Sequence, residues 1–124
     1  MRLEQVFSNL IDNAINYTPS TADFPGVITA RVLADPFGKV LLLQVEDSGP
    51  GIAPAERELV FQPFYRSLGT GVDGTGLGLP IVLEIAVQHD ATVSLEETRL
   101  GKTPPGTRFI VRFVTEQGAT TGIF

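Results

Sequence analysis

The chain has 124 residues, a length typical of one domain, with 9 Lys+Arg against 14 Asp+Glu and a formal net charge of −5. This acidic balance argues against general nucleic-acid binding, which requires cations to neutralise phosphates. The chain has no Cys and a single His, which excludes disulfides, thiolate metal sites and any site built from two imidazoles. The sequence also has no apolar run long enough to span a membrane, and its start lacks the apolar core of a signal peptide.

The first half of the chain predicts a helix followed by a hairpin. Residues 2–17 form the predicted helix, because apolar side chains recur there at helical spacing and Thr18 and Pro19 end the pattern. Alternating, β-branched residues predict strands over 27–34 and 39–47, and the turn sequence Asp-Pro-Phe-Gly between them indicates a hairpin.

The second half predicts a short helix near residues 55–61, an apolar helix over 79–89, and a hairpin of strands 92–97 and 107–114. We therefore expect an α/β fold: a two-layer sandwich with helices on one face of a mixed, mostly antiparallel sheet. Residues 1–115 are the expected domain, and residues 116–124 the expected flexible tail.

Three asparagines fall on one stripe of the first predicted helix. At about 100° per residue, Asn9, Asn13 and Asn16 lie within an arc of roughly 60°, with Tyr17 at its edge. Amide oxygens are neutral, hard ligands suited to Mg²⁺, and amide NH₂ groups can donate to phosphates. A solvated helix face explains the stripe equally well, because Asn competes with the backbone and is a poor helix former.

The second predicted strand ends in Asp47-Ser48-Gly49-Pro50-Gly51-Ile52. A carboxylate at this point can accept the amino group of adenine, whereas guanine presents a carbonyl oxygen that it would repel. Leaving such a buried polar group unpaired costs about 1–3 kcal/mol, so the motif favours ATP over GTP. Alone, the motif is also consistent with an ordinary Asp-Ser-Gly turn.

A second glycine-rich segment, Gly74-Thr75-Gly76-Leu77-Gly78-Leu79, opens the last predicted helix. Free backbone N–H groups and the helix dipole favour phosphate there. The P-loop pattern is absent, and the GxGxxG match at residues 69–74 follows no strand and opens no helix, so it does not indicate a dinucleotide site. The segment between Pro63 and Gly78 is interpreted as a mobile lid, with Arg66 at its root able to reach a terminal phosphate.

Taken together, four segments resemble the motifs of the ATP-binding catalytic domain of bacterial two-component sensor histidine kinases, which has the Bergerat-type ATPase fold. They are, in chain order, NLIDNAINYTP at 9–19, DSGPGI at 47–52, FQPFYR at 61–66 and GTGLGLPIV at 74–82. The resemblance covers residues 2–114, and its specificity comes from the order and spacing of the four motifs.

The resemblance implies ATP and Mg²⁺ as cofactors. It implies that Asn13 is the metal ligand, assisted by Asn9, and that Asp47 binds the adenine amino group. Phe61 and Phe64 would anchor the lid, although they are also compatible with being ordinary core aromatics. The residues implied in ATP binding are Asn9, Asn13, Asn16, Tyr17, Asp47, Gly49, Gly51, Ile52, Phe64, Arg66, Gly74, Thr75, Gly76, Leu77 and Gly78.

The resemblance also implies a function for the longer protein. The domain would donate the γ-phosphoryl group of ATP to a histidine on a separate dimerisation domain, which would pass it to a response regulator. His89 is not expected to be that acceptor, because it lies at a helix end. The chain is therefore interpreted as a monomeric fragment, the cytoplasmic part of an inner-membrane sensor, unable to phosphorylate itself. Two alternatives stay open: a non-catalytic nucleotide sensor, and a serine-directed kinase of the same fold.

Three positions depart from the family pattern. Asn16 stands where Lys is frequent, which removes a cation from the phosphate site. His89-Asp90-Ala91 stands where His-Gly-Gly is expected, and Asn9 stands where the hydrolytic relatives carry a Glu as general base. Because an amide cannot take a proton from water, we do not expect rapid ATP hydrolysis.

Overall fold

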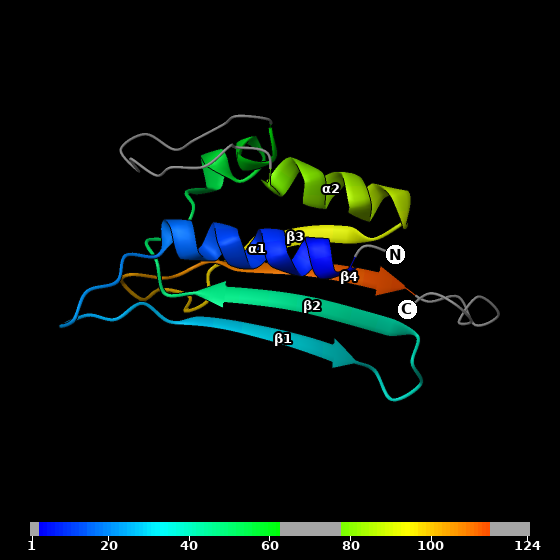
Figure 1. Cartoon of the computed structure of the whole chain (residues 1–124), viewed down its shortest axis with the longest axis horizontal. Helices are drawn as coiled ribbons and strands as arrows, with labels where there is room; N and C mark the ends of the chain where they lie inside the picture. Colours follow the sequence, from blue (N-terminus) through cyan, green and yellow to red (C-terminus); the bar gives the residue numbers. More distant parts are fainter. Residues whose placement is uncertain (1–2, 63–77, 115–124) are drawn as a thin grey trace.

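The computed structural model describes residues 3–62 and 78–114. These residues form two helices and four strands in two layers (Figure 1). The helices are α1 (Leu3–Tyr17) and α2 (Gly78–Gln88), and the strands are β1 (Ile28–Ala34), β2 (Val40–Asp47), β3 (Thr92–Glu96) and β4 (Arg108–Val114). Each lies within about one residue of the range that the sequence predicts.

The sheet has the order β1-β2-β4-β3, and its neighbouring strands are all antiparallel. Both predicted hairpins are present, and the long-range pairing of β2 with β4 joins them at the centre of the sheet. The expected two-layer α/β fold is confirmed. Among the described strands, the sheet is antiparallel at every pairing rather than at most of them.

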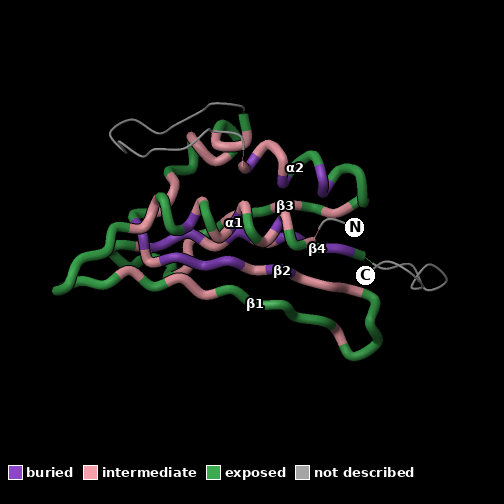
Figure 2. Tube along the Cα trace, viewed as in Figure 1, coloured by how far each residue is buried: buried purple, intermediate pink, exposed green. Residues whose placement is uncertain are grey.

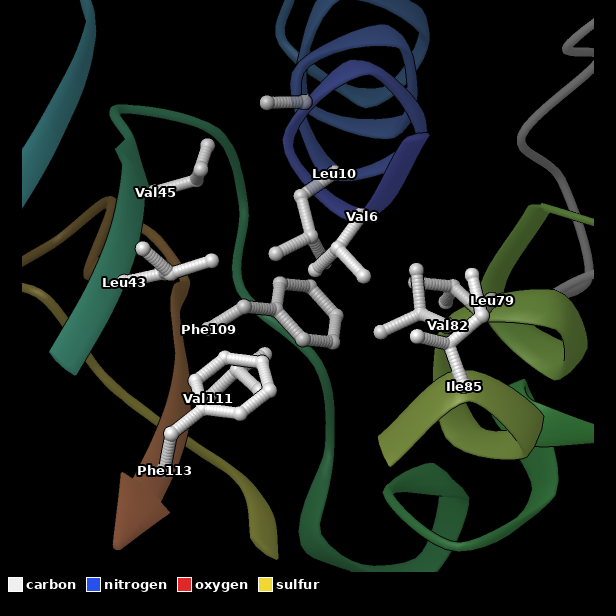
Figure 3. Close-up of a cluster of buried hydrophobic side chains, with 11 residues drawn as sticks. Val6, Leu10, Leu43, Val45, Leu79, Val82, Ile85, Phe109, Val111 and Phe113 are labelled. Carbon is white, nitrogen blue, oxygen red and sulfur yellow. The ribbon is translucent and has the colours of Figure 1, made fainter. Parts of the chain in front are cut away.

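One core joins the two layers. Val6 and Leu10 of α1 and Val82 of α2 are fully buried against the central strands. Figure 3 shows these side chains converging on Phe109 of β4. Buried positions concentrate on β2 and β4, whereas β1 is exposed along most of its length (Figure 2). The sheet therefore buries the face that carries the helices, as expected for amphipathic helices on an antiparallel sheet.

The short helix predicted near residues 55–61 is instead two 3-10 turns, Pro54–Glu56 and Leu59–Phe61. Their hydrogen bonds span three residues, because a segment this short does not repay the cost of nucleating an α-helix. Phe61 packs edge-to-face on Phe109, with ring centroids 6.2 Å apart. Phe61 thus contacts the core, and Phe64 lies outside the described residues.

Helix α2 ends in a left-handed residue that is not glycine. Asp90 has φ 54°, its N–H donates to the carbonyl of Val87, and the N–H of Ala91 donates to the carbonyl of Ala86. These two bonds form a Schellman motif, in which the left-handed position strongly favours glycine. The departure from the expected His-Gly-Gly therefore places Asp where a Cβ is strained.

We expect Asp90→Gly to stabilise the protein by about 0.5–1 kcal/mol, because glycine adopts this backbone conformation without steric cost. Urea unfolding of the two proteins measures the difference. His89→Gly is the matched control: it adds a glycine one residue earlier, where no positive φ is required, and should not stabilise the fold. A decrease in stability for Asp90→Gly would contradict the assignment of strain.

Candidate functional site

The site is centred on Asp47, the last residue of β2. Its side chain is buried, with the residue only 6% exposed, and it lies on the helix-covered side of the sheet. Its Oδ1 accepts hydrogen bonds from the backbone N–H of Gly49 at 2.8 Å and of Thr107 at 3.1 Å. Within the described residues no cation pairs with this carboxylate. One oxygen is thus held by the backbone, and the other is left for a further donor.

Burial raises the pKa of Asp47 above its ordinary value of 3.8, although the backbone hydrogen bonds from Gly49 and Thr107 oppose the shift. The carboxylate therefore carries an unfavourable desolvation that an added hydrogen-bond donor would relieve. Such groups are frequent in binding sites.

This raised pKa predicts a pH dependence of stability. The folded protein binds the Asp47 proton more tightly than the unfolded chain does, so this group's contribution to stability is present below pH 3.8 and is lost as the pH rises through the raised pKa. We expect Asp47→Asn to remove that loss. Chemical unfolding of both proteins across this pH range tests the prediction, and parallel profiles would contradict it.

Close packing explains two glycines around Asp47. Gly51 has φ 81°, and a Cβ there would lie 2.8 Å from Cγ of Pro105. Gly106 has φ 71°, and a Cβ there would lie 2.2 Å from the carbonyl oxygen of Asp47. Both positions require glycine because of the backbone conformation and because protein atoms fill the space. The two turns are also joined directly, since the N–H of Gly106 donates to the carbonyl of Gly49 at 2.9 Å.

Helix α1 connects the Asp47 turn to the start of α2. At its carboxyl end, the carbonyl oxygen of Tyr17 would lie 2.7 Å from a Cβ at Gly49, so helix and turn are in contact. Nearer its amino end, Nδ2 of Asn9 donates to the carbonyl oxygen of Gly78 at 3.2 Å. Helix α1, which carries the first predicted motif, therefore contacts Gly49 of the motif at 47–52 and Gly78 of the motif at 74–82.

The asparagine stripe is only partly shielded. Asn9 and Asn13 are half-buried, whereas Asn16 is exposed. The bond to Gly78 uses the amide nitrogen of Asn9, and no hydrogen bond from another described residue to its amide oxygen is present. No group of three or more His, Cys, Asp or Glu that could hold a metal occurs in the part of the chain that the structure describes. Asn9 and Asn13 are half-buried members of the stripe beside the start of α2, and their role as metal ligands stays a prediction.

The remaining predicted site residues divide into two groups. Ile52 packs against the core at the end of the Asp47 turn. The others lie outside the described residues, and their roles stay predictions: Phe64, Arg66, Gly74, Thr75, Gly76 and Leu77.

Sequence reasoning missed the β4 side of the site. Thr107 is buried at 4% exposure, and its N–H and carbonyl both bond to Asp47. Thr98 also contributes, because its Oγ1 donates to the carbonyl of Asp47 at 3.2 Å. The available signal was the Gly-Thr pair that opens the last predicted strand. Its meaning depends on the pairing of β2 with β4, which local patterns do not show.

Comparison with known proteins places the chain in a class of ATPases. Residues 1–117 match the family described as histidine kinase-, DNA gyrase B-, and HSP90-like ATPase. The chain belongs to this family, as the four motifs indicated, and is an ATPase domain of the histidine kinase type. None of the described helices is long and apolar enough to cross a membrane.

Relatives include the signal transduction histidine-protein kinase/phosphatase MprB of Mycobacterium leprae and that of Mycobacterium avium. Each is 42% identical to the chain over 110 residues, which is 88% of this chain and 20% of the relative. The chain thus spans about a fifth of the length of these relatives.

Solved structures agree with this assignment. A mycobacterial sensor histidine kinase MprB is similar with a TM-score of 0.76 and 32% identity, covering 90% of this chain and 71% of that one. Full-length ShkA in complex with AMPPNP is similar with a TM-score of 0.70 and 29% identity, covering 93% of this chain and 22% of that one. The catalytic domain of histidine kinase ThkA is similar with a TM-score of 0.69 and 27% identity, covering 91% of this chain and 66% of that one.

Proposed function

We propose that this domain binds Mg-ATP, with the adenine amino group on Asp47. The observation that carries the proposal is the buried carboxylate itself: one oxygen is held by two backbone amides, and no described cation neutralises it. An adenine amino group supplies the missing donor, whereas guanine would place an oxygen against the carboxylate. A relative of the same fold, ShkA, was crystallised with the ATP analogue AMPPNP, which supports a nucleotide as the ligand.

We also propose Asn13 and Asn9 as the residues that hold Mg²⁺. Their neutral amide oxygens fit a cation whose charge the triphosphate already balances, and the bond from Asn9 to Gly78 uses its amide nitrogen rather than its oxygen. When bound, the metal would neutralise charge on the phosphates. The amino terminus of α2 at Gly78 is held beside Asn9, which supports this proposal because a helix amino terminus favours phosphate.

In the longer protein, we propose that the domain donates the γ-phosphoryl group to a histidine of a separate dimerisation domain, for transfer to a response regulator. The support is the family and the names of the relatives, which are histidine-protein kinases. This chain's own contribution would be positioning and charge neutralisation. His89, the single histidine, is exposed and follows the last residue of α2. The proposed acceptor is therefore outside this chain, on the cytoplasmic side of a membrane sensor.

Calorimetric titration with a non-hydrolysable ATP analogue, with and without Mg²⁺, tests the binding proposal. We expect Asn13→Ala to weaken Mg²⁺-dependent binding by about tenfold or more, because a metal ligand is lost. Ser8→Ala is the matched control, since Ser8 is exposed on the same helix and outside the proposed site. Unchanged Mg²⁺-dependent affinity in Asn13→Ala would contradict the metal assignment.

Labelled ATP mixed with this domain and the dimerisation domain of the same full-length protein tests the transfer. We expect label on the dimerisation domain, with the acid lability of phosphohistidine. Binding without transfer would favour a nucleotide sensor, and an acid-stable product would favour a serine-directed kinase.

A further inference from the structure

A ladder of charged side chains crosses the face of the sheet opposite the helices. Glu46 alternates with the core residue Val45 and with Asp47, so its side chain projects from the opposite face. Its Oε1 accepts from Nε of Arg108 at 3.0 Å and also bonds Nη1 of Arg31. Nη1 of Arg108 in turn lies 3.7 Å from Oε2 of Glu96. The ladder therefore contains one residue from each of the four strands.

The centre of this ladder is shielded from water. Glu46 is only 9% exposed, and the Arg108 side chain is 28% exposed, whereas the outer members Arg31 and Glu96 are 44% and 52% exposed. Exposed ion pairs contribute little to stability, whereas a pair with a buried member costs more to break. Arg108 is the more shielded of the two cations that Glu46 bonds, so we expect the Glu46–Arg108 pair to contribute most to the stability of the ladder.

This pair adjoins the site on both strands. Glu46 and Arg108 are direct cross-strand partners, and the next residues are Asp47 on β2 and Thr107 before β4. The N–H of Asp47 donates to the carbonyl of Thr107 at 2.8 Å, and the N–H of Thr107 donates to Oδ1 of Asp47. The hold on the carboxylate therefore depends on β2 and β4 staying in register at their ends, where strands open most easily.

We propose that Glu46 and Arg108 are positioning residues for Asp47: their ion pair holds the ends of β2 and β4 together and so sets the domain's preference for a 6-amino purine. The inference rests on the proposed function. It assigns specificity to two residues on the face of the sheet away from the site, which neither touch the base nor belong to any of the four motifs.

The chain supplies a matched control on the same strand. Arg112 also lies on β4 and projects from the same face, because it is an even number of residues from Arg108. Arg112 is exposed and pairs across the sheet with Leu42, four residues from the Glu46 position. Arg112→Gln therefore removes the same charge from the same strand without touching the site.

The experiment compares Arg108→Gln, Glu46→Gln and Arg112→Gln with the wild type. Dissociation constants are measured for Mg-ATP and for the Mg complex of purine riboside triphosphate, which carries hydrogen in place of the 6-amino group. We expect Arg108→Gln and Glu46→Gln to weaken ATP binding by about tenfold, which is the effect of losing one charge-assisted hydrogen bond. The affinity for the analogue should change by less than about twofold, because it lacks the 6-amino group. Arg112→Gln should change neither. Arg108→Lys keeps the cation and should restore part of the preference.

A second readout needs no nucleotide. Hydrogen exchange of the Thr107 and Gly49 amides, both donors to Asp47, should be about tenfold faster in Arg108→Gln, while the amide of Phe113 at the far end of β4 keeps its protection. An equal loss of affinity for both nucleotides, or unchanged amide exchange rates at Thr107 and Gly49, would overturn the proposal. Faster exchange at those two amides in a protein that binds no ATP would instead support the positioning and contradict the proposed function.

Discussion

Replacing Asp47 by Asn is expected to weaken ATP binding by about 100-fold while leaving the fold intact. An amide oxygen can still accept from the N–H groups of Gly49 and Thr107, so the local backbone keeps its partners. The NH₂ group then faces the adenine amino group, and two donors oppose each other. Losing a charge-assisted bond and leaving a donor unpaired together cost about 3 kcal/mol, or about two orders of magnitude in affinity. Calorimetric titration measures this change.

Asp35→Asn is the matched control for that substitution. Asp35 also accepts two backbone hydrogen bonds, from Lys39 and Val40, but it lies in the exposed β1–β2 turn at the other end of the strands. Its pKa is lowered chiefly by the bond from Val40. Because this turn lies away from the proposed site, Asp35→Asn should change the turn and leave ATP affinity unchanged. Equal ATP affinity in wild type and Asp47→Asn would rule out Asp47 as the adenine anchor.

Replacing Gly106 by Ala is expected to cost about 3–5 kcal/mol of folding free energy and to lower Tm by about 12 °C or more. The cost has two sources: a left-handed backbone with φ 71°, and a Cβ placed 2.2 Å from the carbonyl oxygen of Asp47. That carbonyl belongs to backbone, which cannot rotate away as a side chain can. Relief requires β4 to move away from the end of β2, so the Asp47–Thr107 bonds would also weaken. Thermal unfolding measures the cost.

Gly101→Ala separates the two sources of that cost. Gly101 lies in the same β3–β4 connection with φ 75°, and a Cβ there meets nothing within 4 Å. It should therefore lose only about 1–2 kcal/mol, the cost of the left-handed conformation. If both variants lost the same stability, the close approach at Gly106 would have no energetic consequence.

Local sequence patterns were sufficient for most of the fold. Helical spacing of apolar residues predicted α1, and strand alternation around a Pro-Gly turn predicted the β1–β2 hairpin, because both elements depend on neighbouring residues. The pairing of β2 with β4 joins residues more than 60 positions apart, such as Glu46 and Arg108, and no local pattern specifies it. The two 3-10 turns at residues 54–61 were missed for a related reason, since apolar spacing does not distinguish them from one short α-helix.

The site residues also fall into those that local sequence predicted and those that only tertiary contacts reveal. Asp47 was predicted because a carboxylate ending an apolar strand before two glycines is visible in sequence, and the structure shows it buried. The partners that orient it were missed, because Thr107 and Thr98 reach Asp47 through tertiary contacts. The asparagine stripe was visible as a helical pattern, but the bond from Asn9 to Gly78 depends on how α1 packs beside α2. Sequence thus identified the residues with distinctive chemistry, and the structure adds those that position them.

A crystal structure of this chain with Mg²⁺ and a non-hydrolysable ATP analogue would show directly whether Asp47 binds the adenine and Asn13 the metal. We expect the adenine amino group within hydrogen-bonding distance of the Asp47 carboxylate and the metal beside the Asn13 amide. An analogue bound with its base away from Asp47, or a metal held without Asn13, would contradict this expectation.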